Sequence, residues 1–253
     1  MADNDFELPE LPEQYDIQQT DAGLTLNLGA PGEGNDTEAL APRGVSEEDL
    51  VALAQVEQEL TARWPETDID PSLERIELLM DFLGEPQKSF KVIHVAGTNG
   101  KTSTVRMVES LLRSFGNRVG HTTSPHLQSV TERIGIDGEP IHPADFVRIY
   151  REIEPYIQMV DERTGVPMSY FEVMVGLAFA AFADAPVDVA VVEVGMGGAW
   201  DATNVVHADV DVIMPVGLDH TDYLGETISE VAGEKAGIIR LSLIHISEPT
   251  RQE

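Results

Sequence analysis

The chain has no cysteine, few basic residues and no apolar run long enough to cross a membrane. Without cysteine it can form neither a disulfide framework nor a thiolate metal site. Among 253 residues, 45 are acidic and 16 are lysine or arginine, which gives a net charge of −29. A surface of this sign repels nucleic-acid backbones and anionic lipids, so we expect neither nucleic acid nor a membrane as a partner. Because the N-terminus lacks the basic-then-apolar pattern of a secretory signal, we expect a cytoplasmic location.

The first 45 residues differ in composition from the rest of the chain. The first 50 positions hold 13 acidic residues and one base, Arg43, and four prolines interrupt the segment. Such a composition buries too little apolar surface to offset the entropy of folding. We therefore expect residues 1–45 to be a disordered tail, with a partner-binding tail as the alternative. Residues 24–28 alternate like a strand, but this run is short and isolated.

From Ser46 onward, apolar runs alternate with stretches of helical period. Strands are predicted at 91–96, 118–123, 133–136, 187–194 and 209–214, and helices at 46–64, 73–83, 105–115, 143–163, 169–182 and 226–239. Asp70 is predicted to cap the second helix, with Pro71 in its first turn. The alternation predicts an α/β fold over residues 46–240, with a mostly parallel, phosphate-loop-type sheet flanked by helices.

A glycine-containing turn lies between the predicted strand at 91–96 and the following helix. It reads Gly97, Thr98, Asn99, Gly100, Lys101, Thr102, Ser103. Glycines allow backbone N–H groups to turn toward a phosphate, a lysine can reach the β- and γ-phosphates, and a hydroxyl can ligate Mg²⁺. The pattern is incomplete, because Val95 stands where a full phosphate loop has its first glycine. The turn predicts binding of ATP or GTP, and a plain helix N-terminus with an exposed lysine is the alternative.

Further polar residues follow the other predicted strands, where a parallel α/β sheet binds its ligands. Ser124 follows the second strand, Glu193 ends a valine-rich one, and His220 follows the last. A carboxylate at the end of a buried strand is costly unless it is paired or binds metal, so Glu193 is a candidate Mg²⁺ ligand. The alternative is a carboxylate bonded to backbone amides. Taken alone, His220 and Lys235 are typical of a surface histidine and a solvated surface lysine.

Taken together, these segments resemble one family, the folylpolyglutamate synthase/dihydrofolate synthase family, which is related to the Mur ligases. The resemblance extends from about Ser72 to Ile239. It rests on the sequences VIHVAGTNGK (92–101), TSPHL (123–127), ERI (132–134), YFE (170–172), VEVGMGG (192–198), DATN (201–204), GLDHTDYLG (217–225) and EKAGI (234–238), which occur there in the same order and spacing.

The resemblance implies a Mur-ligase-like central domain and an ATP-dependent amide ligase. ATP would phosphorylate the carboxylate of dihydropteroate or a folate, and the amine of L-glutamate would then attack the acyl phosphate. It implies that Lys101 holds the phosphates and that Ser124 and Glu193 hold one Mg²⁺, with Thr102 near it. It further implies that His220 and Lys235 serve a second metal, Lys235 as a carbamate, so that Lys101, His220 and Lys235 are the catalytic candidates. We expect a monomer.

The chain departs from the family in three places. Thr102 and Ser103 follow the loop lysine where the family has glycine and serine, and Ala199 stands where the family has arginine. Family members continue through a second domain, whereas residues 241–253 read like the translation of a sequencing adapter, so we expect this chain to lack ligase activity. Two rival interpretations stay open at this point: a Mur-type ligase with another acceptor, and a non-catalytic nucleotide-binding fragment.

Overall fold

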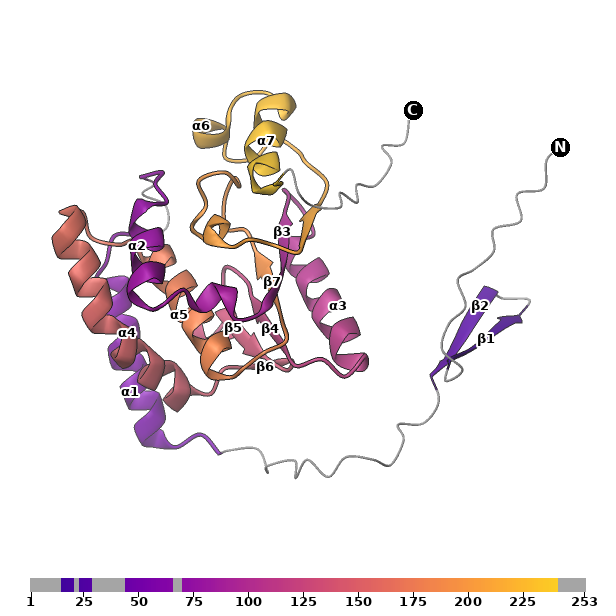
Figure 1. The fold of residues 1–253 in the computed structure, drawn as a ribbon, viewed down its shortest axis with the longest axis horizontal. Helices are drawn as coiled ribbons and strands as arrows, with labels where there is room; N and C mark the ends of the chain where they lie inside the picture. Colours follow the sequence, from indigo (N-terminus) through magenta and orange to yellow (C-terminus); the bar gives the residue numbers. More distant parts are fainter. Residues whose placement is uncertain (1–14, 21–22, 29–43, 66–69, 241–253) are drawn as a thin grey trace. The chain divides into compact units, whose positions relative to one another are not determined.

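The computed structural model describes residues 15–20, 23–28, 44–65 and 70–240, in two units whose boundary follows residue 43 (Figure 1). In the first unit, β1 (Tyr15–Thr20) pairs antiparallel with β2 (Gly23–Leu28). The strand-like run at 24–28 lies within β2. Strand β1 was not predicted, because residues 1–45 were expected to be a disordered tail. The expected adapter-like tail, residues 241–253, lies outside the described residues.

The second unit is built on a six-stranded sheet in the order β6-β5-β4-β7-β3-β8. Its strands are β3 (Lys91–Ala96), β4 (Val119–Thr122), β5 (Ile134–Ile136), β6 (Glu139–Pro140), β7 (Val189–Glu193) and β8 (Val210–Ile213). Strands β4, β7, β3 and β8 run parallel, and β5 and β6 form an antiparallel margin. The predicted mostly parallel α/β sheet is therefore confirmed, and the four parallel strands end at one common edge.

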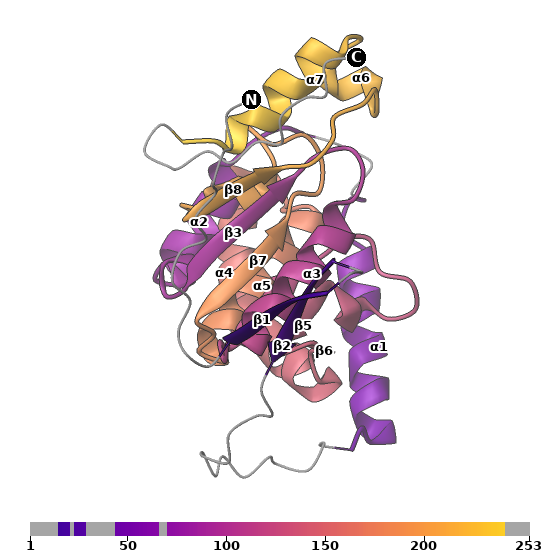
Figure 2. The ribbon, with the colours of Figure 1, turned by 90° about the vertical axis from the view of Figure 1, so that its right-hand side faces the viewer.

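Helices cover both faces of the sheet unequally. One face carries α1 (Glu47–Thr61), α2 (Glu74–Phe82), α4 (Pro143–Thr164) and α5 (Tyr170–Asp184), and the other carries α3 (Lys101–Ser114) (Figures 1 and 2). The short helices α6 (Thr221–Leu224) and α7 (Ile228–Lys235) lie beyond the carboxyl ends of the parallel strands. Short 3₁₀ turns occupy Pro86–Lys88, Val130–Arg133, Ala202–Val205 and Ala236–Ile238. Within the described residues, no helix is both long and apolar enough to span a membrane.

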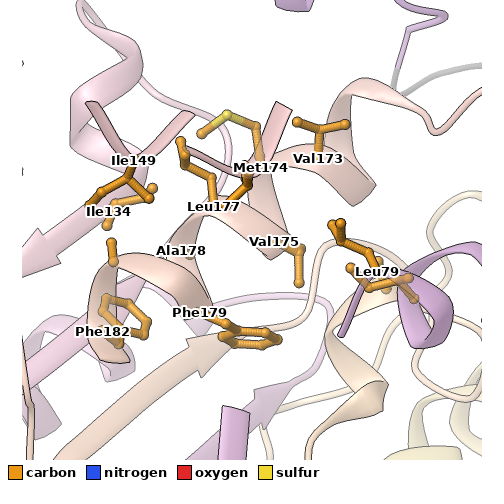
Figure 3. Close-up of a cluster of buried hydrophobic side chains, with 14 of the residues drawn as sticks. Leu79, Ile134, Ile149, Val173, Met174, Val175, Leu177, Ala178, Phe179 and Phe182 are labelled. Carbon is orange, nitrogen blue, oxygen red and sulfur yellow. The ribbon is translucent and has the colours of Figure 1, made fainter. Parts of the chain in front are cut away.

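The main core lies between the sheet and α5 (Figure 3). Helix α5 is apolar around most of its circumference because it is enclosed by the sheet, α2 and α4. Phe179 and Phe182 project from it toward the sheet side, where Phe90 meets both rings. Gly176 brings α5 close to α2, since a side chain there would come within 2.5 Å of Leu79. A smaller cluster of valines packs α3 onto the opposite face.

Short-range sequence patterns predicted some helix ends correctly and others wrongly. The predicted capping box at Ser46 is present, with Ser46 Oγ accepting from Asp49 N and Asp49 Oδ2 accepting from Ser46 N. The predicted cap at Asp70 is wrong. Helix α2 has Leu73 at its N-cap without a side-chain hydrogen bond, because the Asp70 carboxylate is taken up by Arg75 Nη1 at 2.7 Å. Helix α3 begins at Lys101, inside the glycine turn.

Candidate nucleotide and acceptor site

The glycine turn connects β3 to α3 at the carboxyl edge of the sheet. Gly97 has φ 144° and Gly100, the N-cap of α3, has φ 84°, so both occupy backbone conformations that favour glycine. A Cβ on Gly97 would lie 2.5 Å from Met214 Cβ, because the residue after β8 closes against the turn. Asn99 and Ser103 are exposed at the turn and in the first helical turn. The N-terminus of α3 therefore opens to solvent with its N–H groups available to an anion.

Thr98 joins this turn to the loop that follows β8. Its hydroxyl donates to Gly217 O at 3.1 Å, accepts from Gly217 N at 3.0 Å, and its backbone N–H donates to Pro215 O. The side chain thus fastens the segment leading to His220. Although the sequence pattern placed Thr98 among the phosphate-binding residues, its side-chain bonds in this structure are those of a clamp between two loops.

Lys101, Thr102, Ser124 and Glu193 converge beside the turn. Thr102 Oγ1 donates to Glu193 Oε1 at 2.9 Å and lies 3.0 Å from Oε2, and the backbone N–H of Ser124 also bonds the carboxylate. Lys101 Nζ donates to Gly97 O at 3.1 Å. Burial raises the pKa of the Glu193 carboxyl, and the Thr102 hydroxyl, the Lys101 charge and the Ser124 amide oppose this increase.

His220 and Lys235 lie on the α6–α7 side of the site. His220 has φ 49° at the start of α6, its side chain is 47% exposed, and its Nε2 lies 3.6 Å from Asp219 Oδ2. Lys235 is 4% exposed, so the interpretation as a solvated surface lysine is wrong. Burial lowers the pKa of the Lys235 ammonium and the charge of Lys101 lowers it further, while nearby carboxylates act in the opposite direction.

The donor set fits one Mg²⁺ bound together with phosphates. No group of three or more histidine and acidic side chains suited to a metal occurs among the described residues. A magnesium ion usually takes one or two protein carboxylates and completes its shell with water and substrate phosphates. Glu193 with the hydroxyls of Thr102 and Ser124 meets that requirement, and the buried carboxylate has no cationic side chain in ion-pair contact among the described residues.

A cavity of about 370 Å³ opens next to this cluster. Both tryptophans of the chain, Trp64 and Trp200, line it together with Phe171, and Lys101, Ser124 and His220 are among its polar lining residues. Apolar, aromatic walls with a few polar groups at one end are typical of a pocket for a flat organic molecule. Lys101, from the first turn of α3, is among the lining residues, so the cavity adjoins the phosphate turn.

Arg75 and Glu172 support the wall of this cavity, and the sequence reading assigned neither a role. Arg75 Nε donates to Glu172 Oε1 at 2.9 Å, and its guanidinium lies 5.3 Å from the centre of the Trp64 ring. Glu172 also accepts from Ser169 N as part of the capping box of α5. The sequence signal that could have revealed this ion pair was an arginine on the apolar side of the helix predicted at 73–83. Its partner could not be identified from sequence, because it lies 97 positions away.

Asp201 organises the loop after β7, also without a role assigned from sequence. Its carboxylate accepts from Met196 N at 2.8 Å and from Thr203 N at 3.0 Å. Burial raises the pKa of the Asp201 carboxyl, and these donors oppose the increase. Gly195, Met196 and Asp201 all border the cavity. Ala199, which stands where the family has arginine, packs tightly on Gly237. A Cβ added to Gly237 would lie 2.4 Å from the Ala199 Cβ.

The fold and the geometry of the site define the class of the chain. It is an α/β domain of the phosphate-loop type, with a glycine turn leading into a helix, a hydroxyl in the first helical turn and a carboxylate at the end of the neighbouring strand.

Comparison with known proteins places the domain more closely. The dihydrofolate synthase/folylpolyglutamate synthase of Mycobacterium tuberculosis is 57% identical over 222 residues, covering 85% of this chain and 45% of that protein. The crystal structure of the M. tuberculosis folylpolyglutamate synthase complexed with ADP and AMPPCP superimposes with a TM-score of 0.70 at 58% identity, over 75% of this chain and 42% of the other. Escherichia coli FolC in complex with DHPP and ADP gives 0.68 at 40% identity, over 74% and 44%.

No protein-family model matches the chain. Over the part that it spans, the chain belongs to the folylpolyglutamate synthase/dihydrofolate synthase family, as the sequence resemblance predicted. It spans a little under half the length of the relatives that it matches.

Proposed function

We propose that the chain is the nucleotide-binding part of an ATP-dependent ligase that adds L-glutamate to dihydropteroate, to folates, or to both. The observation that carries this proposal is the joining of two features at one sheet edge. The Thr102–Glu193 pair adjoins the phosphate turn, and the cavity with three aromatic walls opens beside it. The relatives' names, and the ADP, AMPPCP and DHPP in their structures, agree with this reading.

In this proposal the chain's own groups position and neutralise the phosphates. Lys101 turns from Gly97 O to the β- and γ-phosphates, and the N–H groups of Gly100 to Ser103 donate hydrogen bonds to phosphate oxygens. Glu193 and the hydroxyls of Thr102 and Ser124 would hold Mg²⁺, which would neutralise charge on the transferring phosphoryl group. Such transfer depends on positioning and charge neutralisation more than on acid–base chemistry.

The acceptor's ring system would lie between the aromatic walls, with its carboxylate toward Lys101. The carboxylate oxygen attacks the γ-phosphorus and ADP leaves. The glutamate amine then attacks the acyl carbon, the bond from that carbon to the phosphate oxygen breaks, and phosphate leaves with the bonding electrons while the amine nitrogen gives up one proton to water. His220 and Lys235 would help to hold a second metal, Lys235 as a carbamate formed when its neutral amine adds to CO₂ and releases a proton. This last assignment rests on the family resemblance. We place the activity in the cytoplasm.

The proposal is tested by joining residues 46–240 to the remaining part of the M. tuberculosis relative and measuring ADP release. We expect release only when ATP, a pteroate-type acceptor and L-glutamate are all present. Release that depends instead on a muramyl-peptide acceptor would favour the alternative of another Mur-type ligase. ATP binding without any acceptor-dependent turnover would favour the alternative of a non-catalytic nucleotide-binding fragment.

A further inference from the structure

A buried chain of hydrogen bonds connects the strand before the phosphate turn to the wall of the cavity. His94 on β3 is 1% exposed, and its Nε2 lies 2.8 Å from Thr203 Oγ1. Thr203, also 1% exposed, bonds Asp201 Oδ1 through both its hydroxyl and its backbone N–H. The other carboxylate oxygen of Asp201 receives the N–H of Met196.

The directions of these bonds follow from the donors available. A carboxylate only accepts, so the single hydroxyl hydrogen of Thr203 goes to Asp201. The Thr203 oxygen can therefore only accept a hydrogen bond from His94. The proton in that hydrogen bond must then be carried by His94 Nε2. Burial lowers the pKa of His94 to about 3, so the ring is neutral and its proton sits on Nε2. Its Nδ1 lies 4.0 Å from Asp211 Oδ1, beyond hydrogen-bond distance.

The chain of bonds ends at the cavity. Met196 and Gly195 form part of its wall, and Asp201 itself borders it, whereas His94 and Thr203 do not. The loop from Gly195 to Asp201 has no regular helix or strand of its own. The Asp201 carboxylate is one of the groups that hold it, and it accepts the Met196 N–H. A hydroxyl able to rotate away from Asp201 would leave that loop less constrained.

We propose that His94 is a positioning residue for the acceptor pocket, acting through Thr203 and Asp201 on the loop at Gly195–Met196. By donating to Thr203 it fixes the hydroxyl so that it donates to Asp201, and Asp201 then holds the Met196 N–H. His94 touches neither nucleotide nor acceptor. The effect on acceptor binding rests on the proposed function, whereas the effect on the loop does not.

The test measures hydrogen exchange at the Met196 amide in the 253-residue chain. In Thr203→Val, which keeps the shape and removes the hydroxyl, we expect exchange to be about tenfold faster at Met196 and unchanged in α3. Thr203→Ser should restore the rate. Thr131→Val is the matched control, a buried threonine away from the cavity. His94→Leu should accelerate exchange at Met196 in the same way. His94→Gln, whose side chain still offers an N–H, should accelerate it less than His94→Leu. Unchanged exchange at Met196, or equal acceleration throughout the unit, would overturn the inference.

A second measurement separates this inference from the proposed function. Binding of 7,8-dihydropteroate is followed by the fluorescence of the two tryptophans, which both line the cavity. We expect Thr203→Val to weaken it about three- to tenfold while MgATP binding changes less than about twofold. Equal weakening of both ligands would overturn the positioning role. If the unaltered chain binds MgATP but neither dihydropteroate nor a folate, the proposed acceptor is wrong, and the exchange rates alone decide the role of His94.

Discussion

Thr102 Oγ1 lies 2.9 Å from Glu193 Oε1 and 3.0 Å from Oε2, which joins the first turn of α3 to the end of β7. The hydroxyl hydrogen points to the carboxylate, so the oxygen keeps its lone pairs for a cation. The two residues lie 91 positions apart, and the parallel register of β3 and β7 brings them together. The pair therefore offers two oxygen ligands at the place where the helix N-terminus offers N–H groups to a phosphate.

Replacing Lys101 by alanine should weaken nucleotide binding while leaving the fold intact. Within the described residues, the ammonium donates a hydrogen bond to Gly97 O, a contact within its own turn, so its loss costs the fold little. A charge-assisted contact to a phosphate contributes about 1.5–3 kcal/mol, which corresponds to a roughly ten- to 150-fold higher Kd for ATP. Calorimetric titration with MgATP measures this, and turnover in the joined enzyme should be abolished. Lys88→Ala, at an exposed lysine, is the control.

Glu193→Gln should raise the Mg²⁺ concentration needed for ATP binding by about tenfold, because a neutral amide is a poorer ligand for a hard cation. Whereas Mg²⁺ binding should weaken, the free energy of unfolding should not fall. Burial raises the folded-state pKa of this carboxyl, so the ionised form costs stability above that pKa, and the cost disappears as pH falls through it toward the unfolded value of 4.5. The variant should therefore be at least as stable as the unaltered chain at neutral pH. Unchanged Mg²⁺ dependence together with reduced stability would contradict the metal assignment.

The sequence predicted the features that depend on neighbours along the chain. Strand β3 has the predicted bounds, because an apolar run followed by a glycine turn leaves little choice. The capping box at Ser46 likewise needs only residues three positions apart. Helix α3 was predicted to start later than it does, since the polar residues Lys101 to Thr104 hide the helical period. Short-range patterns thus located the elements and the phosphate turn.

Features that depend on distant contacts could not be predicted. The error at Asp70 arose because Arg75 competes for its carboxylate, and that geometry requires the Arg75–Glu172 contact between α2 and α5. The burial of Lys235 depends on packing at the end of α7 that no local period encodes. The chain from His94 to Asp201 crosses from a strand to a loop more than a hundred positions later. The contacts of Asp70 and the chain of bonds from His94 to Asp201 belong to the cavity wall or its support rather than to the phosphate turn.

Lys235→Ala in the joined enzyme should lose activity, and short carboxylates such as acetate or formate should partly restore it. The reason is that the proposed functional group is a carbamate, an anion that a small carboxylate can replace, rather than an ammonium. Mass analysis of the unaltered protein under CO₂ should find the adduct at Lys235 and not at the exposed Lys91. Activity that survives the substitution, or that is lost without rescue and without an adduct, would contradict the assignment.

Glu109 should make the domain sensitive to acid. This carboxylate on α3 is 3% exposed, accepts from Gly138 N at 2.8 Å, and lies 2.9 Å from His121 Nδ1. Burial alone would raise its pKa, but His121 and the Gly138 amide outweigh burial and lower the pKa below 4.5. A carboxyl with a lowered folded-state pKa contributes stability above its unfolded pKa and loses that contribution as pH falls through the folded value.

Glu109→Gln should therefore cost about 1–2 kcal/mol of unfolding free energy at neutral pH and lose less than the unaltered chain as pH falls below 4.5. Urea unfolding across this range measures both effects. Glu162→Gln, at an exposed position on α4, is the matched control and should follow the unaltered chain throughout. If Glu109→Gln and the unaltered chain lose stability in parallel below 4.5, the buried contact between α3 and β4 does not favour the ionised carboxylate. The stability of α3 would then have to come from the valine cluster beneath it.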